Sequence, residues 1–185
     1  MAGTLTVDLS TRDVGWACDV GKNRPEYGLM KLPGMKDLGK LYRAAYNGLE
    51  ALVERLEPDR LVFCMALFRD AQTAAEALAG VQAQAILVAY DFQIEARKAN
   101  EMQARKAVLG RGSFGLRDET TGNLVKGMGS KMAKAAVMKW CDDRGYPEGR
   151  PWFTHDCGDA LVLLEYDRMV RYGRPLDGRE ISKEG

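Results

Sequence analysis

Two aspartates stand three residues apart at the start of an apolar segment near the carboxyl end of the chain. Asp156 and Asp159 belong to the run HDCGDALVLLEYD, and we expect a helix over about His155–Tyr172. At this spacing both carboxylates lie on one side of the first helical turn, where acidic groups are well tolerated. The pair is suited to binding a divalent cation. The structural alternative is that Asp156 caps the helix and Asp159 is its N3 partner.

A third carboxylate, Asp8, ends the first apolar segment of the chain, LTVD. An aspartate at the end of a strand and next to a turn can point into a cleft and bind a metal ion. The same position also suits a residue that only forms the turn. His155, beside the aspartate pair, is a candidate proton carrier, because its unperturbed pKa lies near neutrality, or merely shapes the loop before the helix.

The segments that position these side chains alternate between strand and helix patterns. Short apolar runs predict strands, and apolar residues at steps of three and four predict helices. The expected strands are 5–8, 14–19, 27–32, 60–67 and, as a possible edge strand, 92–96; the expected helices are 36–56, 71–90, 101–109, 131–144 and 155–172. We expect one domain over residues 1–172, with a Gly-rich loop or small hairpin insertion at 112–130, and a polar tail at 173–185.

The charge of the chain is unevenly distributed. The 185 residues carry a net charge of +1, yet residues 97–150 contain 12 Lys and Arg against 6 Asp and Glu. A basic segment beside an acidic remainder suits a protein that binds a polyanion and keeps carboxylates for metal ions, although it also fits a solvated helix face. The candidate contacts to DNA phosphates are Lys98, Arg105, Lys106, Arg111, Lys126, Lys131 and Lys134.

Composition excludes several other classes of protein. With 46% hydrophobic and 29% charged residues and 6 prolines, the chain is expected to be globular rather than disordered or collagen-like. No apolar run is long enough to span a membrane, and MAGTLTVDLS does not resemble a secretory signal, so we expect a cytoplasmic protein. Four widely spaced cysteines and a single histidine argue against a structural zinc site.

In their order and spacing, these segments resemble the RuvC-like Holliday junction resolvases, especially the phage and prophage branch. The resemblance rests on LTVDLSTRDVGWACD, RLVFCMALF with the following QTAAEALAGVQAQ, ARKAVLGRG, MKWCDDRGYP and HDCGDALVLLEYD, and it covers residues 5–171. It implies an α/β, ribonuclease H-like fold with a mixed five-stranded sheet flanked by helices. It further implies a homodimer that cuts four-way DNA junctions with Mg²⁺ or Mn²⁺, with Asp8, Asp156 and Asp159 as catalytic, metal-binding carboxylates.

One position departs from the pattern of that family. Where the family has a catalytic Glu in the central strand, followed two residues later by Pro, this chain has Cys64 and Ala66. A thiol is a poor ligand for Mg²⁺, which prefers oxygen. Three explanations are open: another acid such as Asp70 or Glu76 reaches the site, three carboxylates suffice, or the protein binds junctions without cutting them well.

Two other classes of function remain beside the nuclease. The first is a junction-binding or branched-DNA-binding module of the same fold with lost or weakened cleavage. A weaker alternative is an ATP-binding protein of the actin and hexokinase type. That type needs Gly-rich phosphate turns, but the first turn here reads LSTR and the chain is too short for two lobes.

Overall fold

The computed structural model describes residues 3–19, 24–64, 72–115, 127–147 and 149–173. A five-stranded sheet in the order β3-β2-β1-β4-β5 forms the centre of the molecule. The strands are β1 (Gly3–Asp8), β2 (Asp13–Cys18), β3 (Glu26–Lys31), β4 (Pro58–Cys64) and β5 (Glu95–Ala99). The first three strands pair antiparallel, whereas β1, β4 and β5 pair parallel. The sheet is therefore mixed, as expected.

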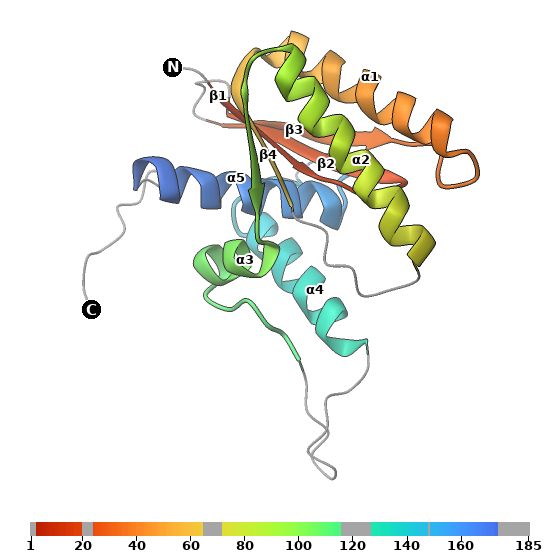
Figure 1. Ribbon diagram of the computed structural model, residues 1–185. Coiled ribbons are helices and arrows are strands. Elements are labelled where there is room, and N and C mark those ends of the chain that lie inside the picture. The colour runs from red at the N-terminus through yellow and green to blue at the C-terminus, as the bar shows by residue number, and fades with distance from the viewer. Residues whose placement is uncertain (1–2, 20–23, 65–71, 116–126, 148, 174–185) are drawn as a thin grey trace.

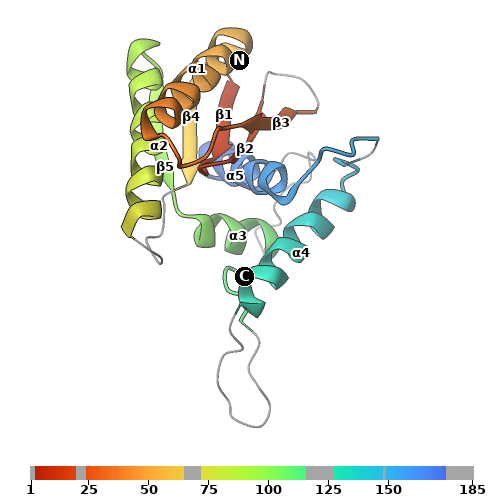
Figure 2. The same cartoon turned by 90° about the vertical axis from the view of Figure 1, so that its right-hand side faces the viewer.

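Within the described ranges, five helices flank this sheet: α1 (Leu38–Leu56), α2 (Gln72–Asp91), α3 (Glu101–Leu109), α4 (Met128–Asp142) and α5 (His155–Tyr172). Figure 1 shows α1 and α2 on one face of the sheet and α5 on the other, with α3 and α4 packed below α5. The quarter turn in Figure 2 shows the same three layers edge on. The predicted α/β architecture, a mixed five-stranded sheet flanked by helices, is confirmed.

Alternation along β1 divides the interior into two cores. Leu5 and Val7 are fully buried in the apolar cluster formed with α1 and α2. Thr4 and Thr6 point to the opposite face, where the Thr6 hydroxyl donates a hydrogen bond to the Ala160 carbonyl of α5 at 2.8 Å. This period of two, with apolar and threonine side chains on opposite faces, fixes the register of the central strand against both helical layers.

The ends of several elements differ from expectation. The chain between α2 and β5 makes a turn in which Gln93 has a left-handed backbone (φ 54°), so the edge strand begins at Glu95 rather than Phe92. The helix expected from Lys131 begins at Met128, which takes the end of the Gly-rich segment into α4. Most of that segment and of the polar tail lies outside the described residues, so the proposed domain limits stay predictions.

None of the helices within the described residues combines the length and apolarity that crossing a bilayer requires.

Candidate active site

Asp8 is the last residue of β1, the central strand of the sheet. Its neighbour across the antiparallel ladder is Gly15 of β2. Within the described part of the chain, the Asp8 carboxylate accepts no hydrogen bond and forms no ion pair. An unpaired carboxylate at the end of a central strand is free to bind a cation.

Gly15 is the residue that lets α5 approach this strand end. A Cβ added to Gly15 would lie 1.9 Å from the carbonyl oxygen of Asp156, so any larger residue would push the start of α5 away from the sheet. Asp8 pairs with Gly15, and Asp156 lies over it. A long-range contact of the backbone thus places the two aspartates at the same edge, although they are far apart in sequence.

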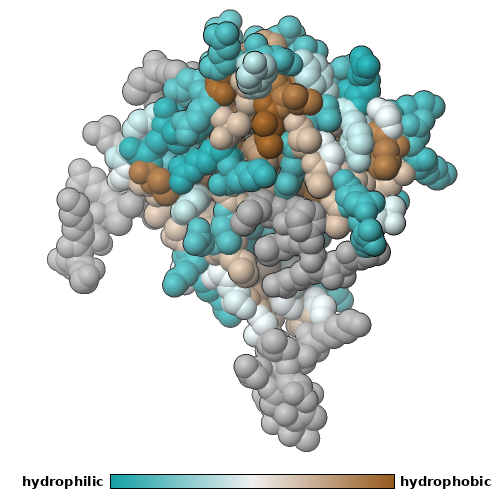
Figure 3. All heavy atoms as spheres, viewed as in Figure 1, coloured by the Kyte–Doolittle hydropathy of each residue, from teal (hydrophilic) through white to brown (hydrophobic). Residues whose placement is uncertain are grey.

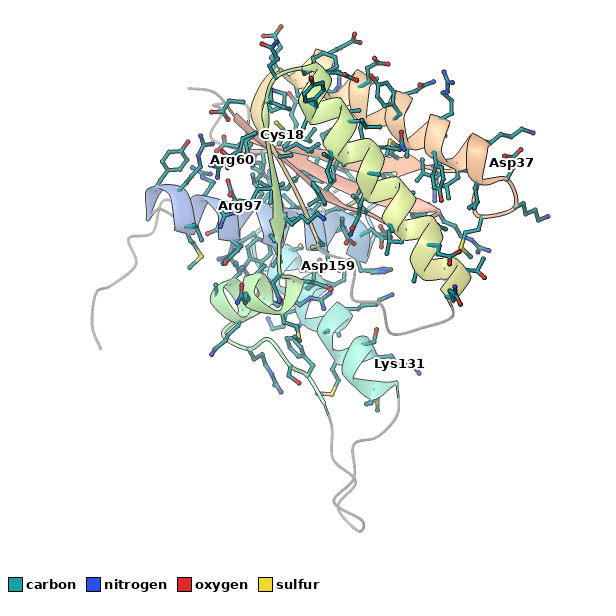
Figure 4. All side chains as sticks on the ribbon, viewed as in Figure 1. Cys18, Asp37, Arg60, Arg97, Lys131 and Asp159 are labelled. Carbon is teal, nitrogen blue, oxygen red and sulfur yellow. The ribbon has the colours of Figure 1, made fainter. Side chains whose placement is uncertain are left out.

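Both predicted aspartates of α5 lie in its first turns, but neither caps the helix. The N-cap residue is Thr154, so the capping interpretation of Asp156 is wrong. Asp156 instead accepts a hydrogen bond from the Thr154 hydroxyl at 3.2 Å, and its other oxygen lies 3.2 Å from His155 Nε2. Asp159 is buried, with 5% of its surface exposed (Figure 4). The structure therefore brings Asp8, Asp156 and Asp159 together.

The three aspartates interact electrostatically. Burial raises the pKa of Asp8 well above its ordinary value, and the charges of Asp159, Glu101 and Asp156 raise it further. Burial is also the main cause that raises the pKa of Asp159 to about 6, while Arg105 acts in the opposite direction. Strongly raised carboxylate pKa values in one cluster are characteristic of functional sites.

Arg105 of α3 is the cation inside this cluster. Its Nε and Nη2 atoms donate hydrogen bonds to Asp159 Oδ1 at 3.2 and 2.8 Å, and Nη2 also contacts Glu101. Only 13% of the Arg105 side chain is exposed. The contact of Arg105 with a DNA phosphate stays a prediction, and in this structure its guanidinium is bound to two carboxylates.

Cys64 ends β4 beside Asp8. Burial raises the pKa of its thiol well above the ordinary value, and the charges of Asp8, Glu101 and Asp159 add to this. The thiol is therefore neutral and supplies no oxygen ligand. Of the acids considered as substitutes, Asp70 lies outside the described residues, and Glu76 is exposed on α2, where it accepts a hydrogen bond from Gln72.

The acid that the sequence did not single out is Glu101, the first residue of α3. Its charge raises the pKa of both Asp8 and Asp159. The only local signal is the dipeptide Asn100-Glu101, a helix cap followed by an acidic first turn directly after a strand.

The chemistry of these donors fits a hard divalent cation. Carboxylate oxygens are the ligands that Mg²⁺ and Mn²⁺ prefer, and Arg105 is a single cation beside Asp8, Asp156, Asp159 and Glu101. Among the described residues, no three His, Cys, Asp or Glu side chains form a ready-made coordination sphere. Asp8, Asp156 and Asp159 are the candidate ligands for such an ion.

The other predicted phosphate contacts lie mostly on the surface of β5, α3 and α4. Lys98, Lys106, Lys131 and Lys134 are exposed, and the Arg111 guanidinium lies 4.8 Å from the centre of the Phe114 ring. Lys126 lies outside the described residues. Figure 4 shows Lys131 near the start of α4, on the same side of the sheet as Asp159. The contact of these cations with DNA stays a prediction.

Several solved structures share the fold of this chain. The structure of RuvC from Thermus thermophilus superimposes with a TM-score of 0.64 at 14% identity, over 92% of this chain and 96% of that one. T. thermophilus RuvC in complex with a Holliday junction substrate gives 0.63 at 10% identity with the same coverage. The yeast mitochondrial Holliday junction resolvase Ydc2 gives 0.59 at 8% identity, over 91% of this chain and 80% of that one.

No family model matches the sequence, and no curated protein matches it either. The likeness is one of fold, and it confirms the ribonuclease H-like architecture that the sequence motifs predict.

Proposed function

We propose that this protein is a metal-dependent, structure-selective endonuclease that cuts branched DNA, such as a four-way junction, by hydrolysis of phosphodiesters. One observation carries the proposal: Asp8 from β1 and Asp156 and Asp159 from α5 meet at one edge of the sheet with negative charge that Arg105 does not balance. This chain also shares its fold with T. thermophilus RuvC, which has been solved in complex with a Holliday junction substrate.

Each candidate residue has its own role in such a reaction. Bound there, Mg²⁺ or Mn²⁺ would lower the pKa of the attacking water and stabilise the leaving oxygen. Asp8 and Asp159 supply oxygen ligands from rigid elements, which fixes their positions. Asp156 supplies a third ligand and keeps His155 within 3.2 Å, where that imidazole can accept or release a proton. No covalent intermediate with the protein is required.

The basic surface supplies the contacts to DNA in this proposal. Exposed lysines on β5, α3 and α4 bind phosphates without reading bases, so affinity falls steeply with salt. Such contacts position the branched DNA over the carboxylates.

A homodimer follows from the same proposal, because resolving a four-way junction requires two symmetric cuts. The exposed apolar side chains Ile86, Leu87 and Tyr90 belong to the C-terminal half of α2. Figure 3 shows apolar side chains gathered there on an otherwise mostly hydrophilic face. Sedimentation equilibrium of the wild type and of Leu87→Lys tests whether α2 forms the contact between subunits.

The test of the nuclease is cleavage of a synthetic four-way junction with Mg²⁺ or Mn²⁺. We expect Asp8→Asn and Asp159→Asn to keep junction binding and to lose cleavage by at least about a thousandfold, since a bound metal ion contributes several kcal/mol to such a transition state. Asp143→Asn, which removes an exposed carboxylate paired with Lys139, is the matched control and should cut normally.

A second function, binding of branched DNA without efficient cleavage, is favoured by two observations. Cys64 provides a neutral thiol beside Asp8, and Arg105 already engages Asp159. Tight junction binding by the wild type, with no metal-dependent cleavage under any condition, would establish this alternative.

A further inference from the structure

Glu101 lies at the same end of the sheet as the three aspartates because of how β5 joins α3. In the parallel ladder Cys64 pairs with Ala99, and α3 begins two residues later at Glu101. The Asn100 side chain accepts hydrogen bonds from the backbone of Met102 at 2.9 Å and Gln103 at 3.2 Å. This cap fixes the first turn of α3, and with it the position of Glu101 beside Cys64.

A single nitrogen atom connects Glu101 to Asp159 of α5. Nη2 of Arg105, one helical turn after Glu101, contacts the Glu101 carboxylate and also lies 2.8 Å from Asp159 Oδ1. The two carboxylates therefore face each other across one positively charged atom. That is the arrangement in which two acidic side chains share a cation.

Glu101 is also accessible where Asp159 is not. A third of the Glu101 side chain is exposed, whereas Asp159 is almost completely buried. The charge of Glu101 acts on Asp8 and on Asp159 more strongly than that of Asp156 does. Glu101 is thus an electrostatic member of the cluster, and it faces the solvent from which an ion would enter.

We propose that Glu101 is the fourth carboxylate ligand of this metal site, and that the Arg105 guanidinium occupies the position between Glu101 and Asp159 until a divalent cation displaces it. The proposal rests on the proposed function. Glu101 thereby supplies from α3 the oxygen that Cys64 of β4 does not supply. Arg105 stabilises the metal-free state, because it neutralises two carboxylates that would otherwise repel each other.

The test is direct measurement of metal binding, without DNA and without cleavage. Mn²⁺ is titrated into the wild type, Glu101→Gln and Arg105→Gln, with calorimetry for affinity and thermal melting for the shift in Tm. We expect Glu101→Gln to lower Mn²⁺ affinity by at least about tenfold. We expect Arg105→Gln to raise the affinity and to enlarge the Mn²⁺-induced rise in Tm, because the competing cation is gone.

Two further variants make the result interpretable. Glu54→Gln changes an exposed glutamate of α1 and should leave Mn²⁺ affinity unchanged. Arg105→Lys keeps the positive charge, so if Arg105→Gln is too unstable to study without metal, the lysine variant should bind Mn²⁺ no more tightly than the wild type. Circular dichroism of each variant establishes that it is folded.

The possible failures are distinct. If the wild type binds Mn²⁺ and Asp8→Asn does not, but Glu101→Gln binds as the wild type does, Glu101 is only an ion-pair partner of Arg105 and the inference is overturned. A loss of affinity in Arg105→Gln would overturn the displacement of Arg105. If the wild type itself binds no Mn²⁺, or Asp8→Asn binds it equally well, the proposed function fails first.

Discussion

The two ends of α5 each bury an aspartate, and the charges of the two are balanced in different ways. Near the C-terminal end, Asp167 accepts a hydrogen bond from Thr4 at 3.0 Å and forms ion pairs with Arg60 at 3.1 Å and Arg97 at 3.3 Å. Near the N-terminal end, Asp159 has Arg105 as its cation, but that cation also serves Glu101. Figure 4 shows Arg60 and Arg97 at one end of the helix and Asp159 at the other.

The difference separates a structural carboxylate from a candidate metal ligand. A buried charge is tolerated when it is paired and hydrogen-bonded, and Asp167 meets this condition within the chain. At the other end, several carboxylates share one guanidinium, and burial raises the pKa of Asp8. Excess negative charge of this kind destabilises the fold unless a cation binds. The comparison therefore points to the N-terminal end of α5 as the metal site.

Apart from the loss of cleavage, we expect the largest effect on stability from Asp167, near the C-terminal end of α5. Asp167→Asn should lower the free energy of unfolding by about 3 kcal/mol, because Arg60 and Arg97 lose a buried partner. This corresponds to a drop in Tm of about 6–12 °C for a chain of this size. Mn²⁺ affinity of the folded variant should be unchanged. A variant that keeps its Tm but binds Mn²⁺ more weakly would reverse the roles assigned to the two ends.

At the proposed metal site, beside the N-terminal end of α5, we expect a smaller effect on stability and one of opposite sign. Asp8→Asn should raise the free energy of unfolding in EDTA at neutral pH by on the order of 1–2 kcal/mol, since it removes a buried charge that other carboxylates repel. Denaturant titration in EDTA measures this gain. With Mn²⁺ present the order reverses, because only the wild type gains stability from the ion.

The pH dependence of wild-type stability tests independently whether Asp8 and Asp159 destabilise the metal-free fold. The folded pKa of Asp8 and of Asp159 lies above the ordinary value of 3.8, so the folded protein binds more protons than the unfolded chain above that pH. The contribution of these two carboxylates to stability in EDTA is therefore fully present below pH 3.8 and is lost as the pH rises through their folded pKa values, which for Asp159 is about 6. Asp8→Asn should flatten this fall. A wild type that becomes more stable over that range would contradict the excess of charge.

Much of the fold could be predicted from the sequence, because its signals are local. The apolar period of three and four residues over α1, and the apolar strands β1 and β4, each depend on neighbours in the chain. The aspartates were predictable for the same reason: Asp8 ends a strand, and Asp156 and Asp159 share a helical turn.

Glu101 was not predicted as a site residue, and Arg105 was predicted only as a contact to DNA, since their places beside the aspartates depend on long-range pairing. In sequence, Glu101 opens a short polar helix, and Arg105 is one of many basic residues. Only the register that pairs Cys64 with Ala99 brings α3 to the carboxylates. Only the burial of Arg105 distinguishes it from the exposed lysines. A count of charges does not distinguish Arg105 from these lysines, whereas its burial in the structure does.

The smallest expected effect is on the salt dependence of junction binding, and it concerns the basic side chains. These also differ between the two ends of α5. Around Asp167, the arginines are used within the chain, as the 2.9 Å pair between Arg171 and Asp59 shows. Lys131 and Lys134 on α4 are exposed and form no ion pair within the described residues. If they bind phosphates, Lys131→Glu with Lys134→Glu should reduce the slope of log K against log salt for junction binding by about 1.8, because each lost contact removes about 0.9.

The control for this last prediction is a charge reversal of equal size elsewhere. Lys36→Glu with Lys40→Glu changes two exposed lysines near the start of α1, on the opposite face of the sheet (Figure 1). It alters the net charge equally, so it should lower the affinity slightly through the overall field and leave the salt slope almost unchanged. Equal slopes for the two double variants would mean that α4 faces solvent in the complex. A lower slope only for the α4 variant would place the DNA on the side of the sheet where Asp159 and Glu101 lie.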